Sequence, residues 1–526
     1  MTPELSRPIL TCDEAKAFEA ALLRDEDAEW DAMQRAGRAM AQALLDDARE
    51  AGGLPDDARL LVLVGKGHNG GDALLAAAFI LDEFPLSFAD IVMVFGTEPL
   101  RPLARRALDV VRRTAAARTR ETDVATVKRE LATYTVCLDG VFGFPFRPPM
   151  DDDTAALLAW VNSHPRIRLR AAVDLPSGLG QEGNARAVFR ADFTYCTGIV
   201  KSPVVAPANA AFVGRARFLD LGFFTAAACG PGALARQETE GAPCPHSAPS
   251  SSSRVLLPSL LRPLGVLRPP QSDKRTYGHL LVVGGSRNYP GAVLMTVQAA
   301  LRSGVGLLTA CVPQSLVPEY AAKFPEAMWA GFPEGGHGGL APAAVEVIRE
   351  RSARATALVL GPGLGAAPET LAAAEGICRI TAYSLPLLLD ADALRPEIVR
   401  AAAGKRLLAT PHAGEWERVR AVWPGDAVLI AKGPPTRVAA GGTDYFSFFG
   451  GPVLARGGSG DLLAGLIGGL LAQAPDDLLL AAAQGVVWHG LAADLLARDR
   501  GQVAVQTTQL LDYLQPALLH AAHAPP

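Results

Sequence analysis

Residues 455–473 read ARGGSGDLLAGLIGGLLAQ, in which a glycine-rich turn ends in Asp461 and leads directly into an apolar segment. Successive glycines at the start of a helix direct backbone N–H groups toward one point, where they and the helix dipole favour a transferring phosphoryl group. A carboxylate at the end of such a turn can accept the proton of an attacking hydroxyl. The alternative is that Asp461 only caps a buried core helix.

The sequence around this stretch alternates between strand-like and helix-like segments. Apolar runs that end in Gly- or Pro-rich turns are HLLVVGGS (279–286), GLLTACVP (306–313), ALVLGPGLG (357–365), LPLLLDADAL (385–394), RLLATPHAGE (406–415) and AVLIAKG (427–433). We expect apolar helices at about 291–303, 461–473 and 479–497. Runs that are apolar on both faces suit parallel strands covered by helices, so this half predicts an α/β fold. Such sheets bind ligands at the carboxyl ends of their strands.

The first half shows the same alternation with different sequences. Its apolar runs are RLLVLVG (59–65), IVMVFG (91–96), TVCLDGVFG (135–143), RAAVDLPSG (170–178) and ADFTYCTG (191–198). Helical spacing is found over 13–50, 73–83 and 101–118. This half therefore also predicts a doubly wound α/β sheet.

The composition changes sharply once along the 526 residues, from about 226 to 254, where Pro, Gly and Ser are frequent and no apolar period is present. We therefore expect a Pro/Ser-rich linker over residues 225–256 between domains at 10–224 and 257–520. A chain of this length is too long for one ordinary core.

Composition also limits the class of protein. A net charge of −4 gives no global electrostatic reason to expect binding to nucleic acid or an anionic membrane. Seven scattered cysteines without a CxxC pair make a disulfide framework or a zinc site improbable. The N-terminus carries acids where a signal peptide would be basic, and the longest apolar stretch, near 462–472, is shorter than a membrane span. We expect a cytoplasmic protein.

Three segments of the first half place polar residues at strand ends. Gly65 to Asp72 form a glycine-rich turn suited to an anion, although a plain strand–helix turn would look similar. Asp139 and Asp174 each end an apolar strand, where an unpaired carboxylate would be costly. Asn69, Asp139 and Ser177 could together offer oxygen ligands to a hard cation, or each could be an ordinary turn or cap residue.

The second half has further candidates beside the glycine turn. Lys432 ends a strand in KGPPT and suits a nucleotide phosphate, and GPGLG at 361–365 allows a close backbone approach to a ligand. His412 follows a proline at a strand end and is a ligand candidate. Asp390 and Asp392 could make water-mediated Mg²⁺ contacts or act as caps.

The motifs KGHNGGD, LDGVFGF and VDLPSG resemble those of the NAD(P)H-hydrate epimerase domain over roughly residues 10–224. The resemblance implies a Rossmann-like fold that interconverts the R and S epimers of hydrated nicotinamide nucleotides. It implies a potassium ion on Asn69, Asp139 and Ser177, with Asp174 as acid/base; His68 replaces the family's usual Asn. The implied substrate-binding residues are His68, Asn69, Gly70, Gly71, Asp72, Gly143, Phe144, Pro145, Phe146, Arg147, Pro148, Pro149 and Asp174.

The motifs KRTYGHLLVVGGS, GPGLG, LLDADAL, TPHAGE, KGPPT and GGSGD resemble the NAD(P)H-hydrate dehydratase domain of the ribokinase-like superfamily over about 258–520. The resemblance implies loss of water from the S hydrate driven by ADP, with Mg²⁺ on the phosphates and Asp461 as the base. The implied hydrate contacts are Ala292, Gly363, His412 and Asp461. The implied nucleotide contacts are Lys432, Gly433, Pro434, Pro435, Thr436 and Gly460.

Two alternatives remain at this stage. The glycine turn also suits a small-molecule kinase fused to a nucleotide-binding domain, and the first half could be a binding or scaffold module without catalysis. If the chain instead has both the epimerase and the dehydratase activity, its partners are NADHX, NADPHX and ADP. In that case we expect no nucleic acid and no membrane partner, and we expect a homo-oligomer.

Overall fold

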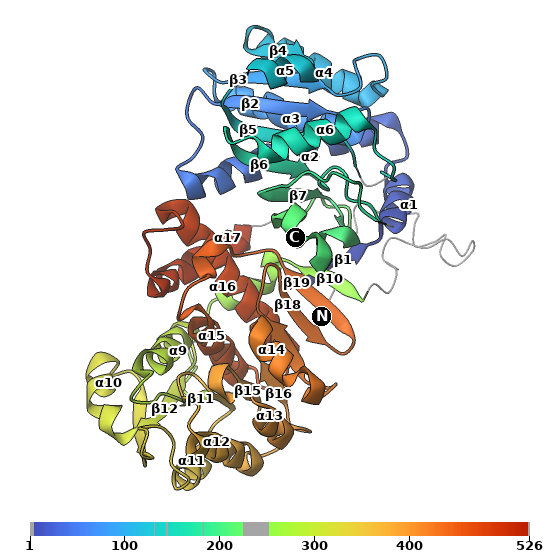
Figure 1. Ribbon diagram of the computed structural model, residues 1–526. Helices are drawn as coiled ribbons and strands as arrows, with labels where there is room; N and C mark the ends of the chain where they lie inside the picture. Colours follow the sequence, from blue (N-terminus) through green and yellow to red (C-terminus); the bar gives the residue numbers. More distant parts are fainter. Residues whose placement is uncertain (1–4, 131, 144–145, 182, 225–251, 524–526) are drawn as a thin grey trace. The chain divides into compact units, whose positions relative to one another are not determined.

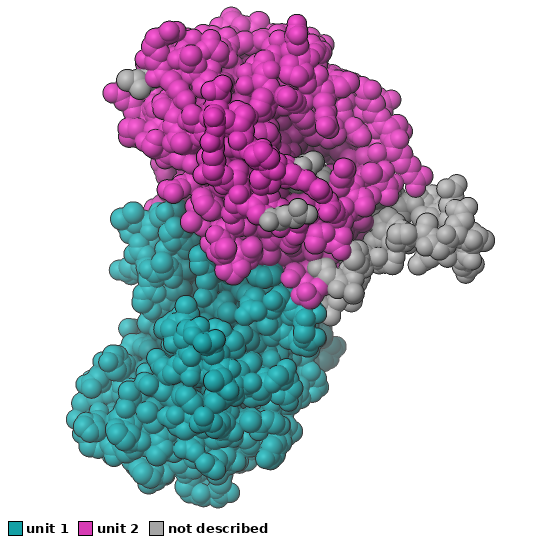
Figure 2. All heavy atoms as spheres, turned by 45° about the vertical axis from the view of Figure 1, so that its right-hand side comes forward, with its two compact units in different colours: residues 1–6, 256–497, 502–524 teal, residues 7–255, 498–501, 525–526 magenta. Residues whose placement is uncertain are grey.

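The computed structural model describes residues 5–130, 132–143, 146–181, 183–224 and 252–523, and the chain divides into two compact units (Figures 1 and 2). The N-terminal unit comprises residues 7–255, 498–501 and 525–526, and the C-terminal unit comprises residues 1–6, 256–497 and 502–524. The expected linker lies outside the described residues as far as residue 251, and strand β10 (Ser253–Leu256) follows.

A seven-stranded parallel sheet forms the centre of the N-terminal unit, in the order β4-β3-β2-β5-β6-β7-β9. The strands are β2 (Arg59–Val64), β3 (Phe88–Met93), β4 (Thr119–Thr122), β5 (Tyr134–Gly140), β6 (Ile167–Val173), β7 (Phe193–Thr197) and β9 (Arg215–Leu219). The order reverses between β2 and β5, so the carboxyl ends of these strands flank the crevice where doubly wound sheets bind ligands. The Rossmann-like expectation is confirmed.

Both faces of this sheet are covered by helices. Leu60 and Val62 of β2 enter a core shared with α2, α3 and α4, whereas Leu61 and Leu63 enter a second core that includes α6. This alternation explains why the strand is apolar at every position. The helices are α2 (Glu26–Ala48), α3 (His68–Glu83), α4 (Pro102–Ala115), α5 (Val124–Glu130), α6 (Asp152–Ser163) and α7 (Ala210–Val213).

The helix expected over 13–50 is in fact two helices, α1 (Cys12–Leu22) and α2. The break occurs because the Asp25 side chain accepts a hydrogen bond from the Ala28 N–H and so starts a new helix. Strand β1 (Ser6–Leu10) precedes α1 and pairs in parallel with β8 (Val200–Lys201), with Leu10 opposite Lys201. This pairing brings the start of α1 beside the end of β8.

The C-terminal unit contains a second sheet, in which β13-β12-β11-β14-β15-β16-β17 are parallel and β17-β18-β19 are antiparallel. The strands are β11 (His279–Val283), β12 (Leu307–Pro313), β13 (Met328–Phe332), β14 (Ala357–Leu360), β15 (Leu387–Leu389), β16 (Leu407–Ala409), β17 (Val428–Ala431), β18 (Thr436–Ala440) and β19 (Thr443–Ser447). The expectation of an α/β fold is confirmed here too.

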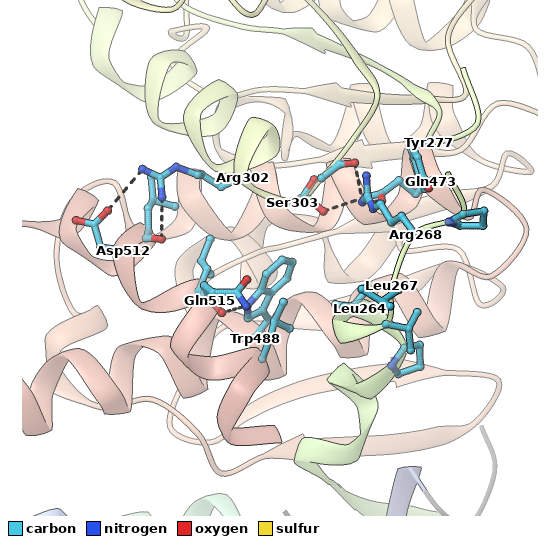
Figure 3. Close-up of a pocket in the computed structure, with 17 residues that line it drawn as sticks. Leu264, Leu267, Arg268, Tyr277, Arg302, Ser303, Gln473, Trp488, Asp512 and Gln515 are labelled. Carbon is cyan, nitrogen blue, oxygen red and sulfur yellow. Dashed lines mark hydrogen bonds and ion pairs between the residues drawn. The ribbon is translucent and has the colours of Figure 1, made fainter. Parts of the chain in front are cut away.

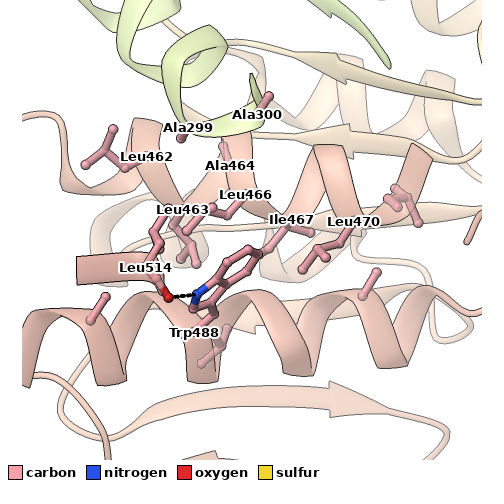
Figure 4. Close-up of a cluster of buried hydrophobic side chains, with 14 of the residues drawn as sticks. Ala299, Ala300, Leu462, Leu463, Ala464, Leu466, Ile467, Leu470, Trp488 and Leu514 are labelled. Atoms are coloured by element: carbon pink, nitrogen blue, oxygen red, sulfur yellow. Dashed lines mark hydrogen bonds between the residues drawn. The ribbon is translucent and has the colours of Figure 1, made fainter. Parts of the chain in front are cut away.

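Two helical layers cover this sheet. The larger core lies against α9 (Pro290–Arg302), α15 (Ser459–Gln473), α16 (Leu478–Arg500) and α17 (Leu514–His523). In this core Trp488 packs beside the leucines of α15 and donates its indole N–H to the Leu514 carbonyl, 2.8 Å away (Figure 4). The smaller helices are α10 (Val317–Lys323), α11 (Ala344–Ser352), α12 (Pro368–Ile380), α13 (Pro396–Ala402) and α14 (Ala413–Val419).

Helix α16 is the one described helix long and apolar enough to cross a membrane by length and composition, with a mean hydropathy of 1.4. Its apolar window is 78% buried inside the unit, where it contributes to the core around α15. Core helices pass the same test, so this length alone indicates nothing about a membrane.

Helices α9 and α15 pack closely because α15 carries glycines on the shared face. A Cβ atom at Gly465 would lie 2.2 Å from the Thr296 carbonyl oxygen of α9, which is backbone and cannot move aside alone. The helix that begins with the glycine turn is thus held in place by contacts that only glycine permits.

Gly465→Ala should destabilise the C-terminal unit. Overpacking of this kind costs about 1–3 kcal/mol, which lowers the midpoint of thermal unfolding by at least about 3 °C in a domain of this size. Gly425→Ala is the matched control, since nothing lies within 4 Å of a Cβ there. Equal midpoints for the two variants, measured by circular dichroism, would contradict the close packing.

Candidate functional site

The first candidate site lies at the carboxyl ends of β2, β5 and β6. A Cβ at Gly65 would lie 1.8 Å from the Val141 carbonyl oxygen, so the turn after β2 touches the loop after β5. A Cβ at Gly143 would lie 2.3 Å from Asn69 Oδ1, which shows that the Asn69 side chain lies directly over this loop. The sheet order therefore brings together segments that are about 70 residues apart in the sequence.

The turn after β2, expected over residues 65–72, is shorter than predicted and ends at Gly67. Helix α3 begins at His68, with Gly67 as an N-cap that provides no side-chain hydrogen bond, so Asn69 to Asp72 belong to the first turns of the helix. The amide groups of a first turn have no partner within the helix and can serve an anion. His68 is half exposed, with Nε2 3.6 Å from Glu29 Oε2, and partial burial lowers its pKa.

Asp139 is fully buried and accepts hydrogen bonds rather than lying unpaired. Its carboxylate accepts from Ser177 Oγ at 2.6 Å, Ser177 N at 2.7 Å and Val141 N at 3.3 Å. Burial raises the pKa of Asp139 to about 6, against the lowering effect of these donors. The Asn69 amide donates to the Val173 carbonyl at 2.8 Å, beside this group. The three predicted cation ligands are thus close together, although backbone donors already satisfy part of the Asp139 carboxylate.

Asp174 belongs to a buried charged cluster, formed by Glu19, Asp72, Asp174 and Lys201. The Lys201 ammonium lies 2.8 Å from Asp174 Oδ1 and 3.5 Å from Glu19 Oε1. Asp174 has a φ of 65°, a strained conformation for a residue with a side chain. Burial raises the pKa of Asp174, while Lys201 opposes that rise. Burial also raises the pKa of Asp72, and the charges of Asp174 and Glu19 add to that effect.

Sequence reasoning missed Glu19, and it singled out Lys201 only as a scarce lysine in the GIVKSP segment, without a role in the site. Lysine is scarce, with eight lysines against 42 arginines, so a lysine between Gly198 and Pro203 was a usable signal for Lys201. Glu19 lies in an ordinary amphipathic helix, and only the pairing of β1 with β8 brings that helix to the strand end.

The loop after Gly143 is only partly described. Phe144 and Pro145 lie outside the described residues. Phe146 is half-buried against Phe142, with ring centroids 4.7 Å apart. Arg147, Pro148 and Pro149 are exposed, and the Arg147 guanidinium lies 3.6 Å from Asp13 of α1.

The second candidate site lies at the carboxyl ends of β15, β16 and β17. Asp390 follows β15, Thr410 follows β16 and Lys432 follows β17. Asp390 Oδ1 accepts from Thr410 Oγ1 at 2.6 Å and from Lys432 Nζ at 3.1 Å. A Cβ at Gly460 would lie 3.0 Å from Lys432 Nζ, so the ammonium also reaches the start of α15.

Asp461 lies in the first turn of α15 and does not cap it. The N-cap is Gly458 in the left-handed conformation (φ 90°), so the interpretation of Asp461 as a simple cap is wrong. Burial raises the pKa of Asp461 from the ordinary 3.8 to about 7, and the negative charge of Asp390 adds to this, while Lys432 opposes it. A carboxylate with a pKa near neutrality can accept and release a proton at physiological pH.

The His412 side chain caps helix α14, and its ring is largely exposed. Its Nδ1 accepts from the Gly414 and Glu415 N–H groups at 3.0 and 3.4 Å, which caps α14. The side chain is 60% exposed, and Nε2 lies 3.3 Å from Glu415 Oε1. A substrate could therefore contact only the Nε2 edge of the ring.

The remaining predicted residues lie around the same strand ends. Ala292 Cβ lies 3.0 Å from where a Cβ at Gly363 would be, and Ser286 Oγ donates to the Gly363 carbonyl at 2.8 Å. Asp392 accepts from the Gly365 N–H at 2.9 Å, so one of its oxygens is already used. In the KGPPT segment, Gly433 and Pro434 are exposed, Pro435 and Thr436 are half-buried, and Thr436 Oγ1 donates to the Gly433 carbonyl at 3.1 Å.

A cavity of about 470 Å³ lies at the opposite ends of α9 and α15 (Figure 3). It is lined mainly by apolar residues with Arg268 and Arg302 at its edge, and it contains none of the predicted site residues. Arg268 donates to the Gly304 carbonyl, and Arg302 lies 3.5 Å from Asp512. We therefore place the chemistry at the strand ends and not in this cavity.

Comparisons with known proteins give one family match in each unit. Residues 30–202 match the family described as YjeF-related protein N-terminus, and residues 280–516 match the family described as NAD(P)H-hydrate dehydratase. The bifunctional NAD(P)H-hydrate repair enzyme Nnr of Gloeobacter violaceus is 34% identical, over 92% of this chain and 93% of that protein. The protein of the same name from Escherichia coli K12 is 29% identical, over 92% of this chain and 89% of that protein.

Among solved structures, ADP/ATP-dependent NAD(P)H-hydrate dehydratase from Bacillus subtilis, co-crystallised with ATP and Mg²⁺, is 26% identical with a TM-score of 0.42. The match covers 50% of this chain and 96% of the Bacillus subtilis chain. The two family matches define a class of enzyme in which a YjeF-related domain precedes an NAD(P)H-hydrate dehydratase domain. The chain belongs to the bifunctional NAD(P)H-hydrate repair enzymes, which it matches over about nine-tenths of its length.

The raised pKa of Asp461 predicts that this residue costs stability above neutral pH. Between pH 3.8 and about 7 the folded state keeps a proton that the unfolded state loses, so stability falls as the pH rises through this window. Asp461→Asn should therefore stabilise the protein at pH 8 by about 4 kcal/mol, and by less than half of that at pH 5. Urea unfolding at both pH values measures this, with the exposed Asp426→Asn as control. If Asp461→Asn were less stable than the parent at pH 8, ionised Asp461 would not be destabilising the folded state.

Proposed function

We propose that the N-terminal unit epimerises the R and S forms of NADHX and NADPHX, and that the C-terminal unit dehydrates the S form to NADH or NADPH. The second reaction consumes ADP and gives AMP and phosphate. The names of the relatives support the pair of activities. The observation that carries the proposal is Asp461, with its pKa near 7, at the start of a helix preceded by a glycine turn.

In the C-terminal unit, Asp461 would act on the C6 hydroxyl of the hydrate. The carboxylate takes the hydroxyl proton as the oxygen attacks the β-phosphorus of ADP, and the bond to the AMP oxygen breaks. Phosphate is a better leaving group than hydroxide, so the C6–O bond then breaks with help from the ring nitrogen lone pair. Loss of a C5 proton restores the ring double bond. The amide groups at the start of α15 stabilise charge on the transferring phosphoryl group.

Lys432 would provide the positive charge for the nucleotide. Its ammonium lies between Asp390 and the start of α15, where a phosphate on the glycine turn would be within reach. The exposed Gly433 and Pro434 leave room for the nucleotide beside it. Gly460 belongs to the same group because a side chain there would meet the ammonium.

A magnesium ion fits the donors of this site. The charges of Asp390 and Asp392 both act on Asp461. Mg²⁺ binds through one or two carboxylates together with waters and substrate phosphates. When bound, the ion would neutralise charge on the phosphates. Asp392 can offer only its second oxygen while the first holds Gly365.

In the N-terminal unit, Asp174 would act as acid and then as base. A protonated Asp174 gives its proton to the C6 hydroxyl, the C6–O bond breaks, and water leaves with the ring nitrogen sharing the positive charge. A water molecule then adds to the other face of C6 and returns a proton to Asp174. The raised pKa of Asp174 favours the protonated form that this cycle requires.

A potassium ion is proposed at Asn69, Asp139 and Ser177. Carboxylate, hydroxyl and amide oxygens are the donors that such a cation prefers. Ser177 contacts Asp139, and Ser177 and Asn69 both contact the Phe142 backbone. The ion would hold Asp139 ionised despite its complete burial. It would also fix the start of α3, where the substrate phosphates are expected to bind.

We further propose that the protein acts in the cytoplasm as a homo-oligomer, without nucleic acid or membrane partners. The net charge of −4 supports the absence of nucleic acid and membrane partners. The buried cysteines at positions 12, 137, 196, 311 and 378 are free thiols, which suits a reducing compartment.

The experiment that tests the function incubates the full chain with mixed R and S hydrates and either ADP or ATP, each freed of the other. Complete recovery of NADH absorbance with ADP is expected, together with inorganic phosphate. A stable phosphorylated product would instead indicate a small-molecule kinase. Faster turnover with ATP would overturn the choice of nucleotide.

Asp461→Asn should reduce dehydration of the S hydrate by about 10²–10⁴-fold, because it removes the base. Epimerisation, followed without nucleotide by chromatography of the two epimers, should be unchanged in this variant. Dehydration near the parent rate would show that Asp461 is not the base.

Asp139→Ala should lower epimerisation and remove any dependence on potassium, because the main charged ligand is lost. Dehydration of pure S hydrate should be unaffected. Parallel assays in potassium-containing and potassium-free buffer measure the dependence for parent and variant. If the parent epimerises equally in both buffers, no potassium ion is needed.

A further inference from the structure

We infer that Glu19, supplied by helix α1, is a positioning residue for epimerisation that shares the Lys201 ammonium with Asp174. The inference rests on the proposed epimerase function. Helix α1 lies before residue 30, where the matched family region begins.

Glu19 and Asp174 both contact the buried Lys201 ammonium, but they differ in exposure to solvent. Lys201 is 1% exposed and reaches Asp174 at 2.8 Å and Glu19 at 3.5 Å. Glu19 is 24% exposed, whereas Asp174 is 4% exposed. Glu19 is therefore the member of this ion pair network that faces water.

The charges of the cluster do not balance if every group is ionised. Among the described residues, Lys201 is the cation that acts on Glu19, Asp72 and Asp174 alike. Three carboxylates beside one buried ammonium would leave a net charge of −2, which is costly in a site with little water. The cluster must therefore retain protons, and burial raises the pKa of all three carboxyl groups accordingly.

Glu19 would control how readily Asp174 keeps its proton. A charged Glu19 draws the ammonium partly away from Asp174, so that Asp174 keeps its proton more readily for the leaving hydroxyl. The thiols of Cys12 and Cys196 are the other titratable groups facing Asp174, and burial raises the pKa of both, so they stay neutral. Removing the charge of Glu19 leaves Lys201 to pair with Asp174 alone, which favours its ionised form.

The fold accounts for the presence of Glu19 at this point. Leu10 of β1 lies opposite Lys201 of β8, and the capping box of Thr11 and Glu14 starts α1 directly after that strand. Two turns into α1, Glu19 faces the ammonium. The helix thus has a fixed start next to the lysine it must reach.

The test compares Glu19→Gln with Glu19→Asp and with Glu26→Gln, a change of one exposed charge at the start of α2. Epimerisation of S hydrate is followed in the full chain without nucleotide between pH 5 and 9. In Glu19→Gln the alkaline limb of the kcat profile should move down by about one pH unit, so that kcat at pH 8 falls about tenfold with little change in KM. Glu19→Asp should lie between the parent and Glu19→Gln, and Glu26→Gln should match the parent.

A profile for Glu19→Gln that superimposes on the parent profile would overturn the inference. Equal loss of kcat at every pH would also overturn it, because a merely structural role predicts no shift of the limb. Circular dichroism and dehydration with ADP confirm that the variant is folded. If the parent chain itself does not epimerise the hydrate, the proposed function fails and not the role of Glu19.

Discussion

The sites of this protein depend on one constraint, which is that neighbouring parallel strands end at the same edge of a sheet. The central strands end in residues that are buried on both faces, so the first polar residue after such a strand lies at the edge of a desolvated core. In the C-terminal unit this rule places Asp390, Thr410 and Lys432 in direct contact, although they come from three strands. Desolvation then raises the pKa of the nearby Asp461 carboxyl to about 7.

The two units offset the energetic cost of burying carboxylates in similar ways. Each has one lysine at the end of a strand that pairs with an aspartate, Lys201 with Asp174 and Lys432 with Asp390. In each unit at least one further carboxyl group has a raised pKa, Asp72 in one and Asp461 in the other. A single ammonium among several carboxyl groups leaves a proton available, which is what both proposed reactions require.

Glycine has two separate tasks in these sites. At Gly458 a left-handed conformation lets the turn lead into α15, and at Gly465 the missing side chain lets α15 approach α9. The first task exposes backbone amides to a phosphate, and the second fixes the helix that carries them. Position and rigidity of Asp461 therefore come from the same short stretch of sequence.

The sequence by itself determined the α/β class of both halves, most strands and the glycine turns, because periodicity and turn residues are local properties. It did not predict the break between α1 and α2, which depends on the Asp25 cap, nor β4 and the β18–β19 hairpin, whose sequences are less apolar. It also did not predict β13, whose apolar sequence MWAGF is only five residues long. It also could not show that Ser177 and two backbone amides satisfy Asp139, or that Glu19 meets Lys201. Those contacts join residues 38 and 182 positions apart, and only strand order and pairing decide which distant residues meet.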